Sequence, residues 1–286
     1  MPSTQELRRR IRSVANTAKI TRAMQMIAAS KMRRAQESVV AGRPYSEQMN
    51  SVLSHLAALE RGSDDSSVPL LESRDVATTG IVLITPDRGL AGGLVSNLTR
   101  VVERTVEQTD SPVVIVAVGK KGRNFTLRVG AELKATFEGI GDNPTVEDTR
   151  SISNIVIDEF ESAGVDRVLL AYSKFVNTAV QTPTIETLIP VEPAELSGEG
   201  SVGYIYEPGP IEVLENLLPR YVEMEVYHAV LEAIASEHSA RMVAMKNATD
   251  AANDLIEDLT LQLNKARQEA ITSEMLDIVG GVEAIA

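Results

Sequence analysis

The chain has 286 residues, a net charge of −12 at pH 7, three His and no Cys or Trp. This length allows one or two domains. The absence of Cys excludes disulfides, thiol redox chemistry and Cys-ligated metals, and the scarcity of His argues against a histidine metal site. No apolar run is long enough to span a bilayer, and the N-terminus has no apolar signal core. We therefore expect a cytosolic protein of bacterial type, with an Arg-rich transit peptide as the weaker alternative.

Charge is unevenly distributed along the chain. Residues 1–50 hold ten Lys/Arg against three Glu, a net of +7, so the remainder carries −19. A basic segment on an acidic protein indicates an acidic partner, a nucleic acid, or pairing with the acidic part of the same chain. No recognised DNA-reading motif accompanies the basic cluster, which disfavours the nucleic acid.

The N-terminal segment, residues 1–60, predicts a long helix. Core-type residues recur at alternating steps of three and four, which is the period of a coiled-coil seam. Pro44 interrupts the series and predicts a kink or a short break. A second apolar stripe at Ile20, Met24 and Ile27 predicts packing against more than one neighbour. The seam residues are Leu7, Ile11, Val14, Ala18, Thr21, Gln25, Ala28, Met32, Ala35, Val39, Gly42, Met49, Leu53 and Leu56.

The C-terminal segment, residues 210–286, has the same pattern. No Pro or Gly lies between His228 and Ala270, so nothing there breaks a helix. About 60 helical residues would extend roughly 90 Å, and a helix of that length has to find a partner helix. The seam residues are His228, Leu231, Ala235, His238, Met242, Met245, Thr249, Ala252, Ile256, Leu259, Leu263, Ala266 and Ala270.

Two long helices at opposite ends of one chain predict an antiparallel intramolecular coiled coil, with a parallel homodimer as the alternative. The intramolecular pair is favoured because the residues between the helices have the pattern of a compact insertion that brings the ends together. The predicted organisation is a helix over 1–60, a central α/β domain over 76–208, and a helix over 210–286 that pairs with the first.

The central segment alternates predicted strands with predicted helices. Short apolar runs next to Gly and Pro are typical of buried strands, and amphipathic stretches are typical of helices. This alternation predicts an α/β fold with a mainly parallel sheet. The predicted strands are 80–85, 112–118, 133–137, 166–172, 184–191 and 202–206, the helices are 94–108 and 146–163, and the longer loops are 61–75 and 193–200.

A glycine-rich turn at residues 87–93 follows the first predicted strand and precedes a helix, which is where phosphate-binding loops lie. It lacks the Lys-Ser/Thr ending of a P-loop and the spacing of the dinucleotide fingerprint. A structural turn is therefore the favoured interpretation over a nucleotide site. Lys120 and Lys121 predict a second turn, basic and solvated.

No group of residues predicts catalysis or metal binding. No Ser/His/Asp triad or isolated carboxylate pair stands out. His228 and His238 are ten residues apart rather than four, so they predict polar seam positions that fix the helix register instead of metal ligands. The Met residues within 24–32 and 242–245 predict flexible packing. We expect no catalytic residue, no cofactor and no metal.

Several long segments resemble the γ subunit of F-type ATP synthase. The resemblance runs from one end of the chain to the other, with each motif in the matching place. Many members of that family have Cys where this chain has Ala91, and no Cys-containing regulatory insert is present, so thiol control is not expected. The matching segments are 16–32 (NTAKITRAMQMIAASKM), 85–93 (TPDRGLAGG), 241–249 (RMVAMKNAT), 264–268 (NKARQ), 271–274 (ITSE) and 278–281 (IVGG).

The resemblance implies a central rotor shaft. Such a subunit turns inside a ring of three α and three β subunits and couples proton or ion flow through the membrane sector to ATP synthesis or hydrolysis. The α/β domain would lie beside the ε subunit and the membrane c-ring, peripherally at the cytoplasmic face of the plasma membrane, and the ATP chemistry would belong to the ring. No nucleic acid is implied.

The resemblance also implies contacts with the ring, residue by residue. Met24 matches a shaft position that faces an acidic loop of β, and five basic residues nearby are electrostatic partners for that loop. Further along, the upper end of the shaft makes polar contacts with β. The implied contact residues are Met24, Lys19, Arg22, Lys31, Arg33, Arg34, Arg241, Arg267, Gln268 and Thr272.

Two hypotheses from other classes stay open at this stage. A nucleotide-binding α/β enzyme with helical arms would bind ATP or NAD as an isolated chain. A basic coiled-coil protein for nucleic acid would bind DNA with a steep salt dependence.

Overall fold

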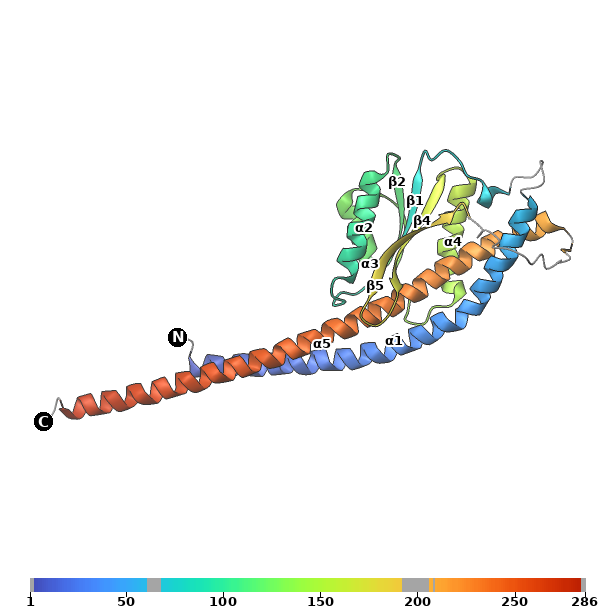
Figure 1. Ribbon diagram of the computed structural model, residues 1–286. Helices are drawn as coiled ribbons and strands as arrows, with labels where there is room; N and C mark the ends of the chain where they lie inside the picture. Colours follow the sequence, from blue (N-terminus) through green and yellow to red (C-terminus); the bar gives the residue numbers. More distant parts are fainter. Residues whose placement is uncertain (1–2, 61–67, 192–205, 208, 284–286) are drawn as a thin grey trace. The chain divides into compact units, whose positions relative to one another are not determined.

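The computed structural model describes residues 3–60, 68–191, 206–207 and 209–283 (Figure 1). Two long helices, α1 (Thr4–Glu60) and α5 (Pro210–Glu283), flank an α/β segment in the sequence. Contacts divide the chain into two units, which we call the helical unit (Met1–Ala28 with Arg241–Ala286) and the α/β unit (Ala29–Ala240). Each long helix contributes one segment to each unit.

A five-stranded sheet forms the centre of the α/β unit, with the strand order β3-β2-β1-β4-β5. β1, β2, β3 and β4 are mutually parallel, and β5 is antiparallel to β4 at one edge. The remaining elements are β1 (Thr79–Ile84), β2 (Val113–Val118), β3 (Glu132–Phe137), β4 (Arg167–Phe175), β5 (Gln181–Ile189), α2 (Leu94–Gln108), α3 (Lys120–Val129), α4 (Val146–Glu161) and a short 3₁₀ helix (Pro69–Leu71). The mainly parallel sheet predicted from the sequence is confirmed.

Helices cover both faces of the sheet, because alternate strand residues point to opposite sides. On one face, Ile81 and Leu83 pack with Leu98 of α2 and Phe125 of α3. The other face supports the larger core, in which α4 and the α/β-unit segments of α1 and α5 pack on Val82 and its neighbours. Largely apolar strands such as β1, buried along its whole length, are typical of sheets covered on both sides.

The antiparallel pairing of the two long helices is confirmed in each unit. In the helical unit the hydroxyls of Thr21 and Thr249 lie 2.7 Å apart. In the α/β unit Gly42 lies against the ring of His228. As the residue number rises along α1, the number of its neighbour falls along α5, so a parallel homodimer is not needed to cover either seam.

The predicted seam agrees closely with the observed burial. Every predicted seam residue of α1, from Leu7 to Leu56, is buried or half-buried, and so is every one of α5 as far as Ala266. Ala270 is exposed, so its assignment to the seam is wrong. In the second stripe, Ile20 and Ile27 are 61% and 56% exposed, whereas Met24 is half-buried.

Some predicted elements differ from the structure. Lys120 and Lys121, expected in a solvated turn, open helix α3. A Cβ at Gly122 in this helix would lie 2.9 Å from Thr85 Oγ1, so the glycine is needed for close packing. α1 continues through Pro44 without a break. The predicted strand 202–206 and the loop 193–200 lie outside the described residues, apart from Tyr206, which is not in a strand.

Candidate functional site

The glycine-rich turn after β1 is braced against the start of α3. Asp87 accepts backbone hydrogen bonds from Lys120 at 2.9 Å and from Gly139 at 2.9 Å. The first free N–H groups of a helix form an anion site in nucleotide-binding folds. Here a carboxylate of the chain itself occupies that position, which favours the structural interpretation of the turn.

Two more contacts close the same junction. The Gly122 N–H donates to Thr85 Oγ1 at 2.6 Å, and the Lys121 N–H donates to the Pro86 carbonyl at 3.3 Å. Gly119 has φ +90, and a Cβ there would overlap the Thr85 carbonyl oxygen, so only glycine fits. These contacts fix the carboxyl ends of β1 and β2 to each other.

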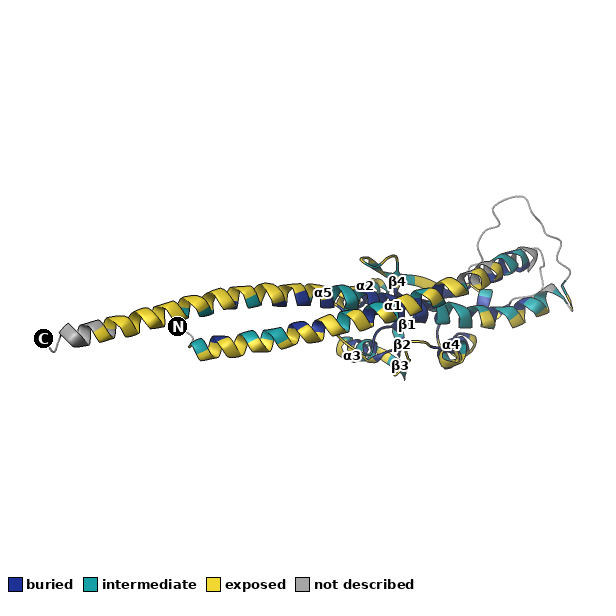
Figure 2. Cartoon of the chain, turned by 90° about the horizontal axis from the view of Figure 1, so that it is seen from below, coloured by how far each residue is buried: buried dark blue, intermediate teal, exposed yellow. Residues whose placement is uncertain are grey.

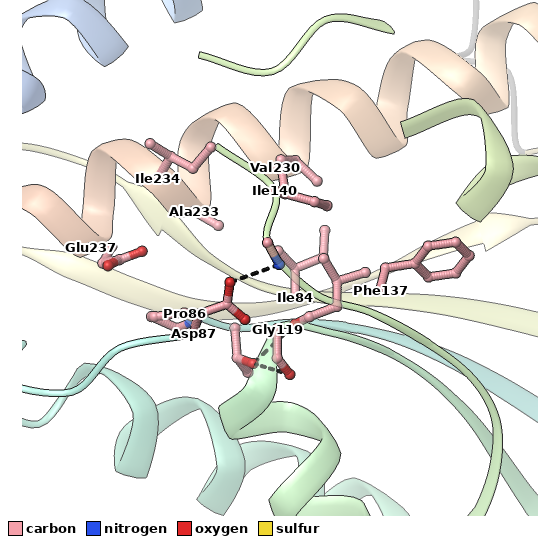
Figure 3. Close-up of a pocket in the computed structure, with 13 residues that line it drawn as sticks. Ile84, Pro86, Asp87, Gly119, Phe137, Ile140, Val230, Ala233, Ile234 and Glu237 are labelled. Atoms are coloured by element: carbon pink, nitrogen blue, oxygen red, sulfur yellow. Dashed lines mark hydrogen bonds between the residues drawn. The ribbon is translucent and has the colours of Figure 1, made fainter. Parts of the chain in front are cut away.

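A small cavity lies beside this junction, between the carboxyl ends of the strands and α5 (Figure 3). Its volume of about 50 Å³ is room for little more than a water or two. Most of its lining is apolar and includes Ile84, Phe137 and Ile234, and the acidic residues Asp87 and Glu237 also line it. Among the described residues no group of His, Asp and Glu is arranged to hold a metal ion.

The helical unit presents basic and apolar side chains together on α1. Lys19 and Arg22 are exposed, next to exposed Ile20 and Ile27, whereas Met24 is half-buried. One helical face therefore combines positive charge with uncovered apolar surface. Such a combination is typical of a face that meets an acidic partner.

The remaining basic residues expected at this face differ in their surroundings. Arg33 pairs with Glu37 at 3.1 Å and Arg34 contacts Ser30 Oγ at 3.5 Å, and both arginines are exposed. Lys31 instead forms an ion pair with Asp142 at 2.6 Å inside the α/β unit. The sequence signals did not separate this lysine from its neighbours.

The predicted contact residues of α5 lie in the helical unit. Arg267, Gln268 and Thr272 are exposed, and Thr272 donates to the Gln268 carbonyl at 2.9 Å. Arg241 is half-buried. Large apolar side chains beyond residue 270 are also exposed, between 56% and 66%: Ile271, Met275, Leu276 and Ile278.

The two seam histidines do not act alike. His238 is 3% exposed and bonds through Nε2 to Asp142 Oδ1 at 2.8 Å, which fixes α5 against the loop before α4. His228 packs against Gly42, and burial lowers the pKa of its imidazole. Sequence reasoning missed the Asp142 bonds and the Thr21–Thr249 hydrogen bond, because both depend on which residues face each other across long sequence separations.

Comparison with known proteins identifies the family. A profile of the family described as ATP synthase matches residues 3–285. The ATP synthase gamma chain of Dehalococcoides mccartyi strain CBDB1 is 54% identical over 286 residues, which cover all of both chains. That of Chloroflexus aurantiacus strain J-10-fl is 47% identical over 288 residues, covering all of this chain and 99% of the relative. This chain belongs to the ATP synthase gamma-chain family.

Solved structures agree with this assignment. A chain of the Tetrahymena thermophila mitochondrial ATP synthase central stalk and c-ring is 27% identical with a TM-score of 0.62, over 80% of this chain and 99% of that one. A chain of the Euglena gracilis mitochondrial ATP synthase rotor has a TM-score of 0.68 at 19% identity, over 94% and 98% of the two chains, and shares the fold. As a member of the gamma-chain family, the chain is a subunit of an ATP synthase. No helix in the described part of the chain is long and apolar enough to cross a membrane.

Proposed function

We propose that this chain is the central rotor shaft of an F-type ATP synthase and has no catalytic site of its own. It couples proton or ion flow through the membrane sector to ATP synthesis or hydrolysis by rotating within a ring of three α and three β subunits. The observation that carries the proposal is the antiparallel pairing of α1 and α5 along both units. Two paired helices resist bending and twisting better than one, because their seam side chains interdigitate.

A passive role in ATP chemistry is supported by the junction after β1. The helix N-terminus that would bind phosphate in a nucleotide enzyme is capped by Asp87. Reactions at the ring would then respond to this chain through differential contact: each rotary position favours a different state of a β subunit.

The ring is expected to meet the exposed face of the helical unit and the α1 residues that follow it. We propose that Met24, Lys19, Arg22, Arg33 and Arg34 face an acidic loop of β. Further along the helical unit, the contacts are made by Arg241, Arg267, Gln268 and Thr272. The exposed apolar residues beyond 270 would turn against an apolar inner surface of the ring with little resistance, because apolar contacts are non-directional.

The sheet-containing part of the α/β unit is the proposed foot of the rotor. We assign residues 1–60 and 210–286 to the shaft and 76–208 to the domain that meets the ε subunit and the c-ring. The Tetrahymena structure, named as central stalk and c-ring, supports this assignment. The chain would then be a peripheral protein at the cytoplasmic face of the plasma membrane.

The direct experiment reconstitutes the complex in vesicles with and without this chain. With the chain, ATP hydrolysis should drive proton uptake, and a probe fixed to the α/β unit should rotate during hydrolysis. A complex that lacks the chain and still pumps protons on ATP would overturn the proposal. ATP binding by the isolated chain at micromolar affinity would instead favour a nucleotide enzyme.

The ring contacts need a separate comparison of charges. Lys19→Gln combined with Arg22→Gln should reduce the coupling of ATP hydrolysis to proton pumping. The coupling of this variant should also depend less on salt concentration, because ions screen exposed charge pairs and the variant has fewer of them. The matched control is Arg100→Gln with Arg104→Gln on the exposed side of α2. Equal effects of the two pairs would contradict a specific contact at α1.

A further inference from the structure

One carboxylate connects both long helices inside the α/β unit. Asp142 lies in the loop between β3 and α4. Its Oδ2 is 2.6 Å from Lys31 Nζ on α1, and its Oδ1 is 2.8 Å from His238 Nε2 on α5. The α/β unit begins at Ala29 and ends at Ala240, so both partners lie within two residues of its limits. The bridge therefore holds α1 and α5 where their segments of this unit end.

Strand β4 and the loop that follows it hold α5 at the same turn. The Ser236 hydroxyl donates to the Ser173 carbonyl at 2.8 Å, and the Ser239 hydroxyl donates to the Thr178 carbonyl at 2.7 Å. Gln181 Nε2 donates to Ser239 Oγ at 3.3 Å. Both serines are fully buried. Buried polar bonds of this kind fix one arrangement, because any other arrangement leaves a buried polar group unsatisfied.

The charge state of Asp142 suits this role. Burial on its own would raise the pKa of the carboxyl, but the bonds to Lys31 and His238 outweigh burial and lower the pKa. The group is therefore ionised at neutral pH. An ionised carboxylate makes charge-assisted hydrogen bonds, which are shorter and stronger than neutral ones.

We propose that Asp142, Lys31 and His238 form a cluster, which we call the collar, that fixes the α/β-unit segments of α1 and α5 to the loop between β3 and α4, with Asp142 as a positioning residue for torque transmission. This inference rests on the proposed function as a rotor. Apolar contacts resist separation of the helices from the sheet, but they are non-directional and allow sliding and turning. The collar bonds have fixed directions, so they oppose rotation of each helix about its own axis. Lys31 accordingly belongs to this internal joint and not to the contacts with the ring.

The collar itself is tested by amide hydrogen exchange in the full chain. Asp142→Asn removes the carboxylate charge and leaves only one acceptor oxygen for Lys31 and His238. Backbone amides of residues 138–145 should then exchange about tenfold faster or more, which is the factor expected for losing one hydrogen bond to a charged group. Glu147→Gln is the matched control, because Glu147 pairs only with the neighbouring Arg150 on an exposed helix turn in the described contacts. In Glu147→Gln, the amides of residues 138–145 should exchange at rates within about twofold of the parent. Unchanged exchange in Asp142→Asn would overturn the collar.

The effect on torque is tested in vesicles that contain the whole complex. The ratio of proton pumping to ATP hydrolysis should fall about twofold or more in Asp142→Asn, and in the same direction in Lys31→Met, which removes one bond and leaves His238 paired. Glu147→Gln should keep the parent ratio. An unchanged ratio in both collar variants would overturn the torque role even if the loop opens.

This pair of measurements separates the inference from the proposed function. If the parent complex fails to couple hydrolysis to pumping through this chain, the rotor function fails, while the exchange result on the loop is unaffected. A merely structural role predicts faster exchange and lower thermal stability with a normal ratio, which distinguishes the two explanations. Asp142→Glu should restore part of the ratio if the charge itself is required.

Discussion

The same two helices are buried very differently in the two units. In the α/β unit, α1 and α5 contribute to a core shared with the sheet and α4, where Leu53 and Leu218 are 1% and 0% exposed. In the helical unit, the described segments of the two helices pack against each other, and small residues such as Ala18 and Ala252 form much of the seam. Figure 2 shows this change along each helix in the spacing of the buried residues. One sequence period thus specifies a globular core in one region and a narrow two-helix contact in the other.

The difference explains what each unit can do. A two-helix contact buries one stripe per helix, so most of its surface stays available for partners. A sheet-backed core buries more apolar area per residue and resists deformation. We therefore expect substitutions in the α/β unit to alter stability and substitutions on the helical unit to alter assembly and coupling.

The largest expected effect comes from truncating a core leucine. Leu218→Ala in the α/β unit should lower the free energy of unfolding by about 2–5 kcal/mol, because the surrounding residues cannot collapse into the cavity. Leu259→Ala in the helical unit should lower it by only about 1–2 kcal/mol, close to the transfer term, because solvent and neighbouring side chains can fill the space. Urea unfolding with amide exchange assigned to each unit measures both. Equal losses would contradict the proposed difference in packing.

The next effect tests close approach of the helices in the α/β unit. Gly42→Ala should lower the free energy of unfolding by about 1–3 kcal/mol through overpacking, since the new methyl group would overlap the His228 ring. Helix propensity predicts the opposite sign, a gain of about 1 kcal/mol. The sign of the change in thermal stability therefore shows whether overpacking against His228 or helix propensity dominates, and we expect overpacking to dominate.

The control for this prediction removes the His228 ring that the new methyl group would overlap. In Gly42→Ala combined with His228→Ala, the added methyl group should cost less than it does in the parent. A stabilised Gly42→Ala single variant would show that the helices can separate at this point without penalty.

These comparisons also show which features the sequence could predict. The seam from Leu7 to Leu56 followed from its period, because burial of one helical stripe depends on local spacing alone. Helix α2 was predicted with the observed bounds, since its apolar face is strongly periodic. The buried strands β1 and β2 followed from their continuous apolar runs.

Other features needed the three-dimensional arrangement. Helix α3 begins with Lys120 and contains Gly122, and its packing on Thr85 overrides the weak local preference. Asp142 is one acidic residue in a polar loop, with no period or motif around it. Its role appears only when β3, α1 and α5 are brought together. Exposure of Ile20 and Ile27 was likewise hidden, because a stripe in the sequence does not say what covers it.

A smaller effect is expected at the polar pair in the helical seam. Thr21→Val or Thr249→Val should each cost about 0.5–1.5 kcal/mol, because each removes the 2.7 Å hydroxyl–hydroxyl bond and leaves one hydroxyl with only its own backbone bond. The double valine variant should cost less than the two single changes together. Amide exchange of residues 14–28 and 242–256 is the measurement. Additive losses would mean that the hydroxyls do not act as a pair.

The smallest expected effect is a pH dependence of stability that arises from a half-buried carboxyl group on α5 in the α/β unit. Glu225 is half-buried on α5, and burial, followed by Glu186 and Glu232, raises the pKa of its carboxyl despite an opposing effect of Lys174. Tyr172 donates to Glu186 at 3.1 Å in the same region. Glu225 and Glu232 of α5 and Glu186 of β5 therefore form a group of carboxylates that repel one another.

The raised pKa sets the sign of a pH effect. The unfolded chain releases the Glu225 proton near pH 4.3, whereas the folded chain keeps it to a higher pH, so folding becomes less favourable as the pH rises through that interval. Glu225→Gln removes this penalty, so the stability of the variant relative to the parent should grow as the pH rises from 4 to 7. Glu215→Gln, an exposed position on the same helix, should show no such trend. Thermal unfolding across this pH range decides the matter: a Glu225→Gln advantage that stays constant with pH would rule out proton uptake at this carboxylate.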